Sequence, residues 1–283
     1  MSWSSPVLHP TVEQYRKNGL VYYRVANAYC TGTVHQQGAH VTEYSPGMHK
    51  PVLWMSELSN FEPGKPFRGG IPICFPWFGK GPNGDMEPLH GPVRIANWQL
   101  EKNTLNHYGE TKLVFYYSEP EMFILRYSVV FGSALTTTLE IKNSSTKNIH
   151  SYEAMLHNYF AVKDAQKTYV TGLGSVPYLN RINNEQTQGE PTATFFNQRI
   201  DRLYNNRNTL RISDTVNNRI ITTDCDGMKS TCLWNPGPDM KFDDIKPDGW
   251  KDFVCVENGN ASDQIISLQP GSTCYLKQTI SVV

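Results

Sequence analysis

Apolar and polar residues alternate with a period of two through much of this chain, and that pattern limits its possible folds more than any other feature. From Leu135 to Lys142 every second residue is Leu, Thr or Ile, and the residues between them are Thr, Glu and Lys. The C-terminal residues Cys274 to Val282 repeat the pattern. Successive side chains of a β-strand point to opposite faces of a sheet, so both segments predict strands with one buried face. Amphipathic helical periodicity is scarce.

Further strand-like runs recur along the sequence, usually separated by Gly, Asn, Asp or Pro. They are Leu20–Val25, Val52–Met55, Leu113–Tyr117, Ile124–Val130, Arg219–Thr223 and Phe253–Val256. This spacing is typical of antiparallel all-β folds. Because we find no Ser- or Gly-rich linker and no repeat of fixed period, we expect one domain, residues 1–283, with two antiparallel sheets packed face to face.

Three other stretches carry local predictions. The best helix candidate is a turn or two near Asp239–Asp244. The polar stretches Asn180–Asn184 and Asn205–Asn208 are expected to be exposed loops.

The balance of charges excludes several classes of partner. The 283 residues include 26 Lys plus Arg and 26 Asp plus Glu, so no overall field recruits nucleic acid or an anionic membrane. Any recognition of an anion must be local. No apolar run approaches the ~20 residues that span a bilayer, and the N-terminus has no signal-peptide pattern. We expect a cytoplasmic protein.

The six cysteines are scattered without C-x-x-C pairs. In a chain of this length such spacing argues against a disulfide framework and against a zinc site. We expect buried, reduced thiols that act as small apolar side chains.

The stretch Phe67–Arg94 suits neither a helix nor an unbroken strand, because it combines glycines, prolines, aromatic rings, two arginines and a histidine. Glycines let a backbone approach a ligand closely, and prolines fix the bends between them. Aromatic faces suit the apolar face of a sugar, and guanidinium groups suit a carboxylate or phosphate. Taken alone, the stretch is either a surface loop or the wall of a binding pocket.

Four elements in order resemble the hexose-6-phosphate mutarotases, within the aldose 1-epimerase superfamily. They are the R-G-G-I-P-I-C-F-P-W-F-G run from Arg68, the H-G-x-x-R element at 90–94, the H-x-Y-F element from His157, and Trp234–Gly237 followed by Phe253–Glu257. The resemblance implies a galactose-mutarotase-like antiparallel β-supersandwich. It also implies a monomeric isomerase that interconverts the α and β anomers of hexose 6-phosphates, with D-glucose 6-phosphate as the expected substrate.

Opening a pyranose ring at C1 needs two proton movements. A base takes the proton of the C1 hydroxyl, and an acid delivers one to the ring oxygen. One carboxylate and one imidazole on opposite sides of the ring suffice, without a metal or redox cofactor.

The family motifs assign these roles, although a lone Glu or His in such surroundings is more often structural. They imply Glu257 as the base, His157 as the acid and His90 as a residue that binds the sugar. Glu257 follows an apolar run, where partial burial would raise its pKa. Asn258–Asn260, after it, is expected to form a loop.

Arg68 and Arg94 are the candidates for binding the phosphate. Two guanidinium groups offer several charge-assisted hydrogen bonds to a dianion. Pro92 and Val93 stand where the family pattern H-G-F-A-R has Phe and Ala, so the resemblance does not determine the direction of the Arg94 side chain.

Asp201 lies in a segment similar to the D-R-x-Y element of the family. Its carboxylate is expected either to accept hydrogen bonds from sugar hydroxyls or to pair with Arg199 or Arg202. Trp234 and Trp250 are either a platform for the sugar or core residues, and core is favoured for Trp234.

Two other functions remain open at the level of sequence. A mutarotase of unphosphorylated aldoses would use the same acid and base but would have no use for two arginines. A carbohydrate- or sugar-phosphate-binding protein without chemistry would not need an acid and a base on one ring.

Overall fold

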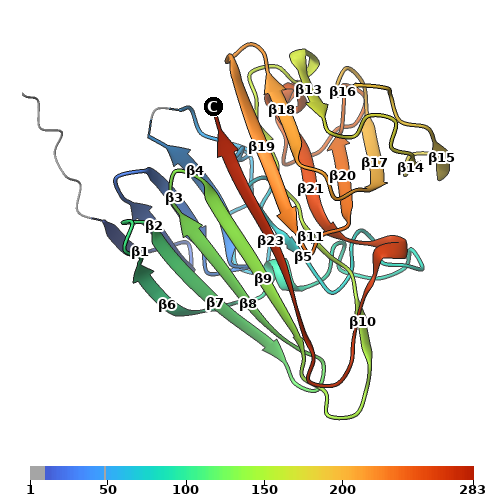
Figure 1. Ribbon diagram of the computed structural model, residues 1–283. Helices are drawn as coiled ribbons and strands as arrows, with labels where there is room; N and C mark the ends of the chain where they lie inside the picture. Colours follow the sequence, from blue (N-terminus) through green and yellow to red (C-terminus); the bar gives the residue numbers. More distant parts are fainter. Residues whose placement is uncertain (1–9, 48) are drawn as a thin grey trace, which may run out of the picture.

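The computed structural model describes residues 10–47 and 49–283, which fold almost entirely into antiparallel strands (Figure 1). The helices in this part of the chain are four 3-10 turns: η1 (Val93–Ile95), η2 (Ala165–Lys167), η3 (Gly249–Asp252) and η4 (Ser262–Gln264). The prediction of an all-β chain is confirmed.

The helical turn predicted near Asp239–Asp244 was wrong. These residues form irregular turns between Pro238 and Pro247, and proline disfavours helical geometry in the residue before it. Asp244 instead pairs with Arg68, which holds the segment against the stretch near residue 68.

The larger sheet has nine strands in the order β16-β13-β18-β19-β23-β9-β8-β7-β6. Their bounds are β16 (Ala193–Phe195), β13 (Thr168–Thr171), β18 (Leu210–Asp214), β19 (Arg219–Asp226), β23 (Thr273–Val282), β9 (Leu135–Asn143), β8 (Phe123–Phe131), β7 (Thr111–Glu119) and β6 (Gln99–Leu105). Alternate residues of β8 and β9 are buried along their whole length, which confirms the strands predicted from the alternation.

The second large sheet has the order β15-β14-β17-β20-β21-β11-β5, with β12 also paired to β21. The bounds are β15 (Glu185–Thr187), β14 (Tyr178–Asn180), β17 (Ile200–Asn205), β20 (Ser230–Asn235), β21 (Phe253–Asn260), β11 (Ala154–Leu156), β5 (Ile73–Cys74) and β12 (Tyr159–Ala161). The loop predicted at Asn258–Asn260 was wrong, because these residues continue β21 and pair with β11. The amide of Asn258 is satisfied inside the protein by Thr223 and Gln278.

Apolar side chains of both large sheets meet in one core. Leu125 and Tyr127 of β8 belong to the same buried cluster as Val254 and Val256 of β21. Each such side chain contributes about 1.5–3 kcal/mol by leaving water. This core supports β21, the strand that carries Glu257.

Two smaller sheets complete the structure. One contains β1 (Thr11–Lys17), β2 (Leu20–Ala26), β3 (Cys30–His35) and β4 (His40–Pro46), and the other pairs β10 (His150–Tyr152) with β22 (Ile266–Leu268). Gly32 of β3 lets the four-stranded sheet pack closely on the core, since a Cβ there would lie 2.1 Å from the ring of Phe131.

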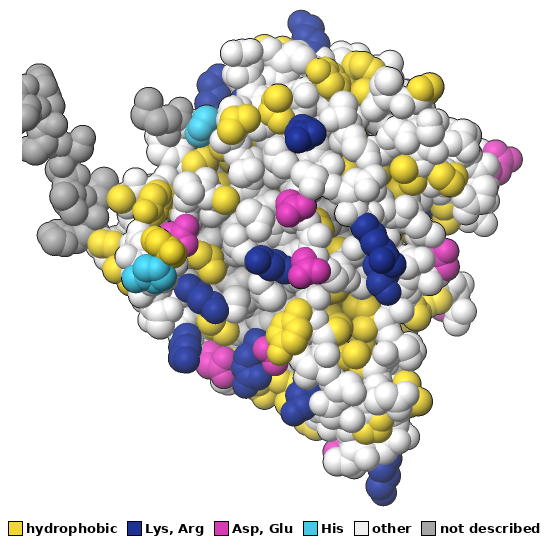
Figure 2. Space-filling view, in the orientation of Figure 1, with side chains coloured by type: hydrophobic (Ala, Val, Ile, Leu, Met, Phe, Trp, Pro, Cys, Tyr) yellow, Lys and Arg dark blue, Asp and Glu magenta, His cyan; other side chains and the backbone are white. Residues whose placement is uncertain are grey.

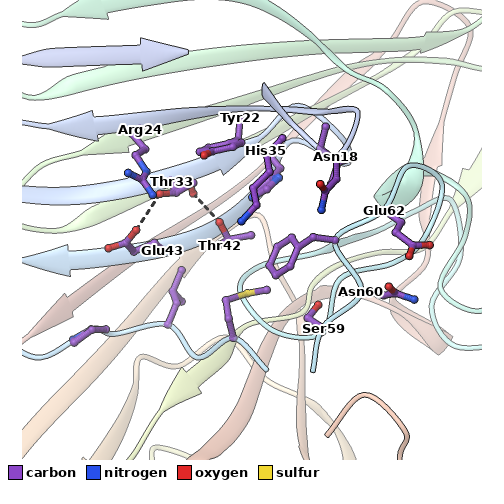
Figure 3. Close-up of a pocket in the computed structure, with 16 residues that line it drawn as sticks. Asn18, Tyr22, Arg24, Thr33, His35, Thr42, Glu43, Ser59, Asn60 and Glu62 are labelled. Atoms are coloured by element: carbon purple, nitrogen blue, oxygen red, sulfur yellow. Dashed lines mark hydrogen bonds between the residues drawn. The ribbon is translucent and has the colours of Figure 1, made fainter. Parts of the chain in front are cut away.

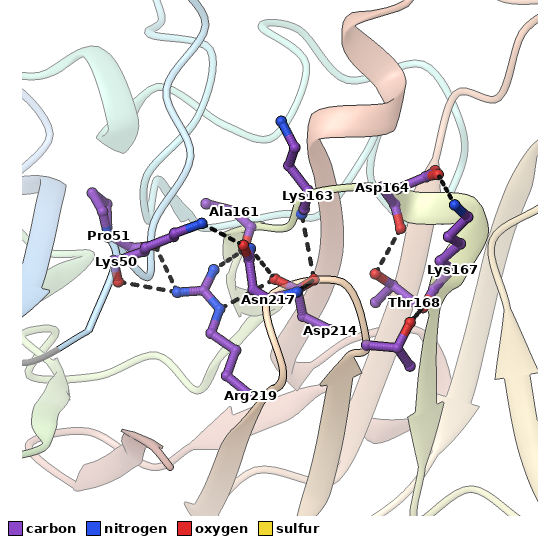
Figure 4. Close-up of polar contacts among 11 residues, drawn as sticks. Lys50, Pro51, Ala161, Lys163, Asp164, Lys167, Thr168, Asp214, Asn217 and Arg219 are labelled. Carbon is purple, nitrogen blue, oxygen red and sulfur yellow. Dashed lines mark hydrogen bonds and ion pairs between the residues drawn. The ribbon is translucent and has the colours of Figure 1, made fainter.

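A buried arginine joins distant segments at one end of the sheets (Figure 4). Arg219, the first residue of β19, pairs with Asp214 at the end of β18. Its guanidinium also donates to the carbonyl oxygens of Lys50, Pro51 and Ala161. It therefore connects strands of both large sheets to the segment that follows β4.

Other sequence predictions can be compared with the structure directly. None of the six cysteines is paired in a disulfide; four are buried, as predicted, and two, Cys225 and Cys274, are half-buried. Acidic and basic side chains are interspersed over the face shown in Figure 2. No helix in the described part of the chain is long and apolar enough to cross a membrane.

Candidate active site

The glycines of the Phe67–Arg94 stretch allow it to lie against neighbouring backbone. Gly70 has φ +64°, and a Cβ on it would lie 2.3 Å from the carbonyl oxygen of Val41. Beyond it, β5 pairs with β11, so the stretch runs beside His157. The buried carboxylate of Glu153 accepts the N–H of Phe78 at 2.9 Å and that of Ser262 at 2.7 Å, which fixes the position of Phe78.

A cavity of about 270 Å³ opens where this stretch meets β17, β20 and β21. It is lined by Arg68, Phe78, Gly79, Leu89, His90, His157, Arg181, Asp201, Cys232, Trp234, Met240, Phe242 and Glu257. Five of the six residues proposed from the sequence line it, and Arg94 does not.

A larger cavity, of about 660 Å³, lies elsewhere, between the four-stranded sheet and the segment 51–62 (Figure 3). It contains none of the six proposed residues. We assign the candidate site to the smaller cavity because only that one combines an imidazole with a buried carboxylate and arginines.

His157 and Glu257 form a buried pair at the base of the smaller cavity. His157 follows β11 and Glu257 lies within β21, and their Nε2 and Oε1 atoms are 3.4 Å apart. The imidazole ring stacks on Tyr159, with ring centroids 4.6 Å apart. The side chains are 8% and 1% exposed, and the other polar atoms, His157 Nδ1 and Glu257 Oε2, have no hydrogen-bond partner within the described residues.

Burial moves the pKa values of this pair in opposite directions. Desolvation lowers the pKa of His157 well below its usual value, and the nearby His90, Arg68 and Arg94 add to that shift. Desolvation raises the pKa of Glu257 well above its usual value, against the opposing charge of Arg181. A lower pKa makes the imidazolium a stronger acid, and a higher pKa makes the carboxylate a stronger base.

The prediction that acid and base lie on opposite sides of one ring was wrong. A pyranose does not fit between two atoms 3.4 Å apart. The arrangement still suits ring opening, because the C1 hydroxyl and the ring oxygen are bonded to the same carbon and can be reached from one side.

His90 has a fixed tautomer. It adopts φ +67°, and its Nδ1 accepts the backbone N–H of Gly79 at 3.0 Å. The proton of the neutral ring is therefore on Nε2. Burial, with the charges of Arg94, Arg181 and Arg68, lowers its pKa well below the usual value. His90 is thus a neutral hydrogen-bond donor at the cavity wall.

Arg68 is held from three sides. Its Nε donates to Asp244 at 2.9 Å, its Nη1 donates to the hydroxyl of Tyr159 at 3.2 Å, and its guanidinium lies 4.9 Å from the ring centroid of Phe242. These contacts fix the guanidinium in place at the wall.

Arg181 lines the cavity and was not found from the sequence. Its Nη1 is 3.4 Å from Asp201 Oδ1, and its guanidinium lies 4.6 Å from the ring centroid of Phe78. A Cβ on Gly79 would lie 2.9 Å from its Nη2, so the glycine leaves room for it. It lay within the predicted exposed loop Asn180–Asn184, of which residues 182–184 are exposed.

The ion pair predicted for Asp201 was assigned to the wrong partner. Asp201 pairs with Arg181, whereas Arg202 pairs with Glu190 at 2.7 Å. β14 and β17 are antiparallel neighbours, and the N–H of Arg181 donates to the carbonyl oxygen of Asp201. The partner is therefore set by the pairing of strands distant in sequence. Burial raises the pKa of Asp201 despite this contact.

Arg94 lies in η1, half-buried, and does not line the cavity. Within the described residues its guanidinium makes no hydrogen bond or ion pair with a side chain. Burial lowers its pKa. Its charge reaches the cavity, since it contributes to the lowered pKa values of His90 and His157.

The core position favoured for Trp234 was wrong. Trp234 is half-buried and lines the cavity, with its ring centroid 6.2 Å from that of His157 and 5.9 Å from that of Phe242. A tryptophan in a strand is predicted to be core from its apolar neighbours, but β20 borders the cavity on one face. Trp250 is buried in the core.

Two face-to-face antiparallel sheets with a cavity lined by a buried His–Glu pair, two arginines and aromatic rings are consistent with the class of sugar mutarotases. The chain belongs to the aldose 1-epimerase family, whose model matches residues 22–281. Family membership makes it an epimerase, an enzyme of the isomerase class with a sugar as its small-molecule partner.

Curated relatives and solved structures agree with this assignment. A protein of Escherichia coli (strain K12) is 33% identical over 238 residues, covering 80% of this chain and 79% of its own. A protein of Salmonella typhimurium (strain LT2) is 32% identical over 259 residues, covering 87% of this chain and 85% of its own. Both are named "Putative glucose-6-phosphate 1-epimerase".

A crystal structure from Salmonella typhimurium, described as a "putative mutarotase", superposes with a TM-score of 0.88 at 27% identity, covering 100% of this chain and 96% of that one. The crystal structure of HI1317 superposes with a TM-score of 0.82 at 26% identity, covering 100% of this chain and 98% of that one. These similarities confirm the predicted galactose-mutarotase-like supersandwich.

Proposed function

We propose that this enzyme interconverts the α and β anomers of hexose 6-phosphates, with D-glucose 6-phosphate as the preferred substrate. The observation that carries the proposal is the charge around the cavity. Arg68 and Arg181 line it, and the charge of Arg94 acts on His90 in its wall. Asp244 and Asp201 each pair with one of the lining arginines, and within the described residues Arg94 has no acidic side chain as an ion-pair partner. A local excess of positive charge suits a phosphate dianion in a chain of zero net charge.

The proposed mechanism needs only side chains of this chain. Glu257 removes the proton of the C1 hydroxyl, and His157 delivers a proton to the ring oxygen as the C1–O5 bond breaks. The open aldehyde rotates about C1–C2 and closes on its other face with the proton transfers reversed. His90, as a donor through Nε2, orients the sugar oxygens, and Trp234 with Phe242 offers apolar surface to the ring.

Exchange spectroscopy by NMR tests the proposal directly. Rates of α–β exchange are measured for glucose and glucose 6-phosphate at the same protein concentration and ionic strength. We expect kcat/KM for the phosphorylated sugar to be higher by at least ~10-fold, the contribution of one charge-assisted hydrogen bond. Equal rates for the two sugars would favour a mutarotase of unphosphorylated aldoses. Absence of exchange with both would favour a binding protein.

A further inference from the structure

The buried pair at the base of the cavity has a third neighbour, the thiol of Cys255. One potential ligand atom from each of His157, Cys255 and Glu257 lies within 4.8 Å of the others, and all three residues are buried. We propose that these three side chains form a site for a thiophilic divalent cation such as Zn²⁺, and that the bound ion inhibits the enzyme. The inhibition, unlike the binding, rests on the proposed roles of His157 and Glu257.

The strand pairing brings the three donors together. Cys255 and Glu257 are two residues apart on β21, so their side chains point to the same face of the sheet. β12 runs antiparallel to β21 with Tyr159 opposite Cys255, and the ring of His157 stacks on that of Tyr159. The sequence alone does not reveal these three ligands as a group, because His157 comes about a hundred residues before Cys255 in the chain.

The spacing of the nitrogen and oxygen ligands suits a tetrahedral ion. Zn–N and Zn–O bonds of about 2.0–2.1 Å at tetrahedral angles place the two ligand atoms about 3.3 Å apart. His157 Nε2 and Glu257 Oε1 are 3.4 Å apart, longer than a good hydrogen bond between such groups.

Unused lone pairs are available at the site. Glu257 Oε2 and His157 Nδ1 are buried without a hydrogen-bond partner within the described residues. No partner on Nδ1 fixes the tautomer of His157, so the ring is free to present a lone pair on Nε2. The unpaired carboxylate oxygen of Glu257 calls for a ligand, because leaving it unpaired is costly. When Nε2 coordinates the ion, Nδ1 of His157 carries the ring proton.

The cavity supplies an entry path and a fourth coordination position. His157 and Glu257 line it, whereas Cys255 lies behind them. An ion that enters there meets the imidazole and the carboxylate first and then displaces the thiol proton. Coordination by a thiolate releases the thiol proton, so binding strengthens as pH rises. The bound ion occupies the lone pairs of both the proposed acid and the proposed base, which stops anomer exchange.

Cobalt provides a readout that does not depend on activity. The full chain, freed of metal by a chelator and then dialysed, is titrated with Co²⁺, which gives an intense thiolate-to-cobalt charge-transfer band only when sulfur coordinates it. We expect this band to saturate at one equivalent and to disappear on addition of Zn²⁺. Cys255→Ser should lose the band, and Cys232→Ser, which alters another buried thiol at the same cavity, should retain it.

Inhibition is measured in parallel by the exchange assay. Zn²⁺ should inhibit the wild-type enzyme, and Cys255→Ser should require at least ~10-fold more Zn²⁺. Cys255→Ala provides the same comparison if the serine variant does not fold, with circular dichroism as the check. A wild-type protein without the band, or a band that survives in the Cys255 variant, overturns the metal site. An inactive protein that shows the band contradicts the proposed function but not the site.

Discussion

Burial of Glu257, the proposed base, raises its pKa at the expense of stability. Its pKa is raised in the folded protein, so the unfolded chain ionises first as pH rises through about 4.3. The stability contributed by the neutral carboxyl is therefore present below that pH and lost above it. At neutral pH the raised pKa of Glu257 therefore lowers the free energy of unfolding, a loss of stability that is common at functional sites.

We predict that Glu257→Gln lowers the rate of anomer exchange by ~10²–10⁴, because amides do not act as bases, and at the same time raises the thermal unfolding midpoint. His157→Asn should lower the rate by a similar factor. Exchange NMR and thermal denaturation at pH 7 measure both effects. Glu62→Gln, at an exposed position outside the smaller cavity, is the control and should change neither. A Glu257→Gln variant with near wild-type exchange would remove Glu257 from the mechanism.

Arg181 offers a direct test of the proposed preference for a phosphorylated substrate. Its guanidinium lines the cavity and is oriented by Asp201 and Phe78. We predict that Arg181→Ala lowers kcat/KM for glucose 6-phosphate by at least ~10-fold and lowers kcat/KM for glucose much less. The same comparison for Arg68→Ala and Arg94→Ala ranks the three arginines.

The matched control is Arg202→Ala, since Arg202 pairs with Glu190 and does not line the cavity. It should leave the ratio of the two substrates unchanged. Equal losses for both sugars in Arg181→Ala would make this arginine structural.

At the scale of elements, sheet packing is coupled to the site through a pair of buried amides. Asn158, next to His157, donates to the carbonyl oxygen of Val256 in β21 and exchanges hydrogen bonds with Gln278 of β23. β21 and β23 belong to the two opposed sheets, so the pair spans the space between them.

We predict that Gln278→Ala or Asn158→Ala destabilises the protein by about 1–3 kcal/mol, because the partner amide is left buried and unpaired. The double variant should cost less than the sum of the single ones, since both remove the same interaction. Urea unfolding of all four proteins completes the cycle. Additive free energies would show that the two amides are independent.

The length of a strand decided whether it could be predicted from the sequence. The long strands β8, β9 and β23 were predictable because alternation over eight or nine residues is a strong signal. Strands of three residues, such as β11, β12 and β14, are too short to show a period. The motifs placed His157, Glu257, His90, Arg68 and Asp201 at one cavity. Arg181 and the true partner of Asp201 depend on the register of β14 against β17, which no local pattern encodes.

At the scale of the whole molecule, Arg219 joins segments that the sheets alone leave separate (Figure 4). Its side chain is 5% exposed and that of Asp214 is fully buried. We predict that Arg219→Ala destabilises the protein by about 3–5 kcal/mol, since it leaves a buried carboxylate without its counter-ion and removes the hydrogen bonds to three carbonyl oxygens. The measurement is the unfolding midpoint in urea. Arg211→Ala, an exposed arginine on the adjacent β18, should stay within about 0.5 kcal/mol of the wild type.

Buried histidines set the response of the whole molecule to acid. Burial lowers the pKa of His35 to about 4 and that of His40 to about 3, and it lowers those of His90 and His157 well below their usual value. The unfolded chain binds protons at these residues near pH 6.5, where the folded chain does not. The unfolded state therefore holds more protons as pH falls, and stability is lost below about pH 6.5 and retained above it.

We predict a steep fall in the free energy of unfolding between pH 6.5 and 4, with His35 alone contributing on the order of 3 kcal/mol, from a pKa difference of about 2.5 at 1.36 kcal/mol each. Urea unfolding at pH 7, 6, 5 and 4.5 measures the slope. His35→Gln cannot take up the proton, so its slope should be shallower even if the variant is less stable at pH 7. His107→Gln, at an exposed position, should keep the wild-type slope. If His35→Gln lost stability with pH as steeply as the wild type, acid lability would have to arise from other groups.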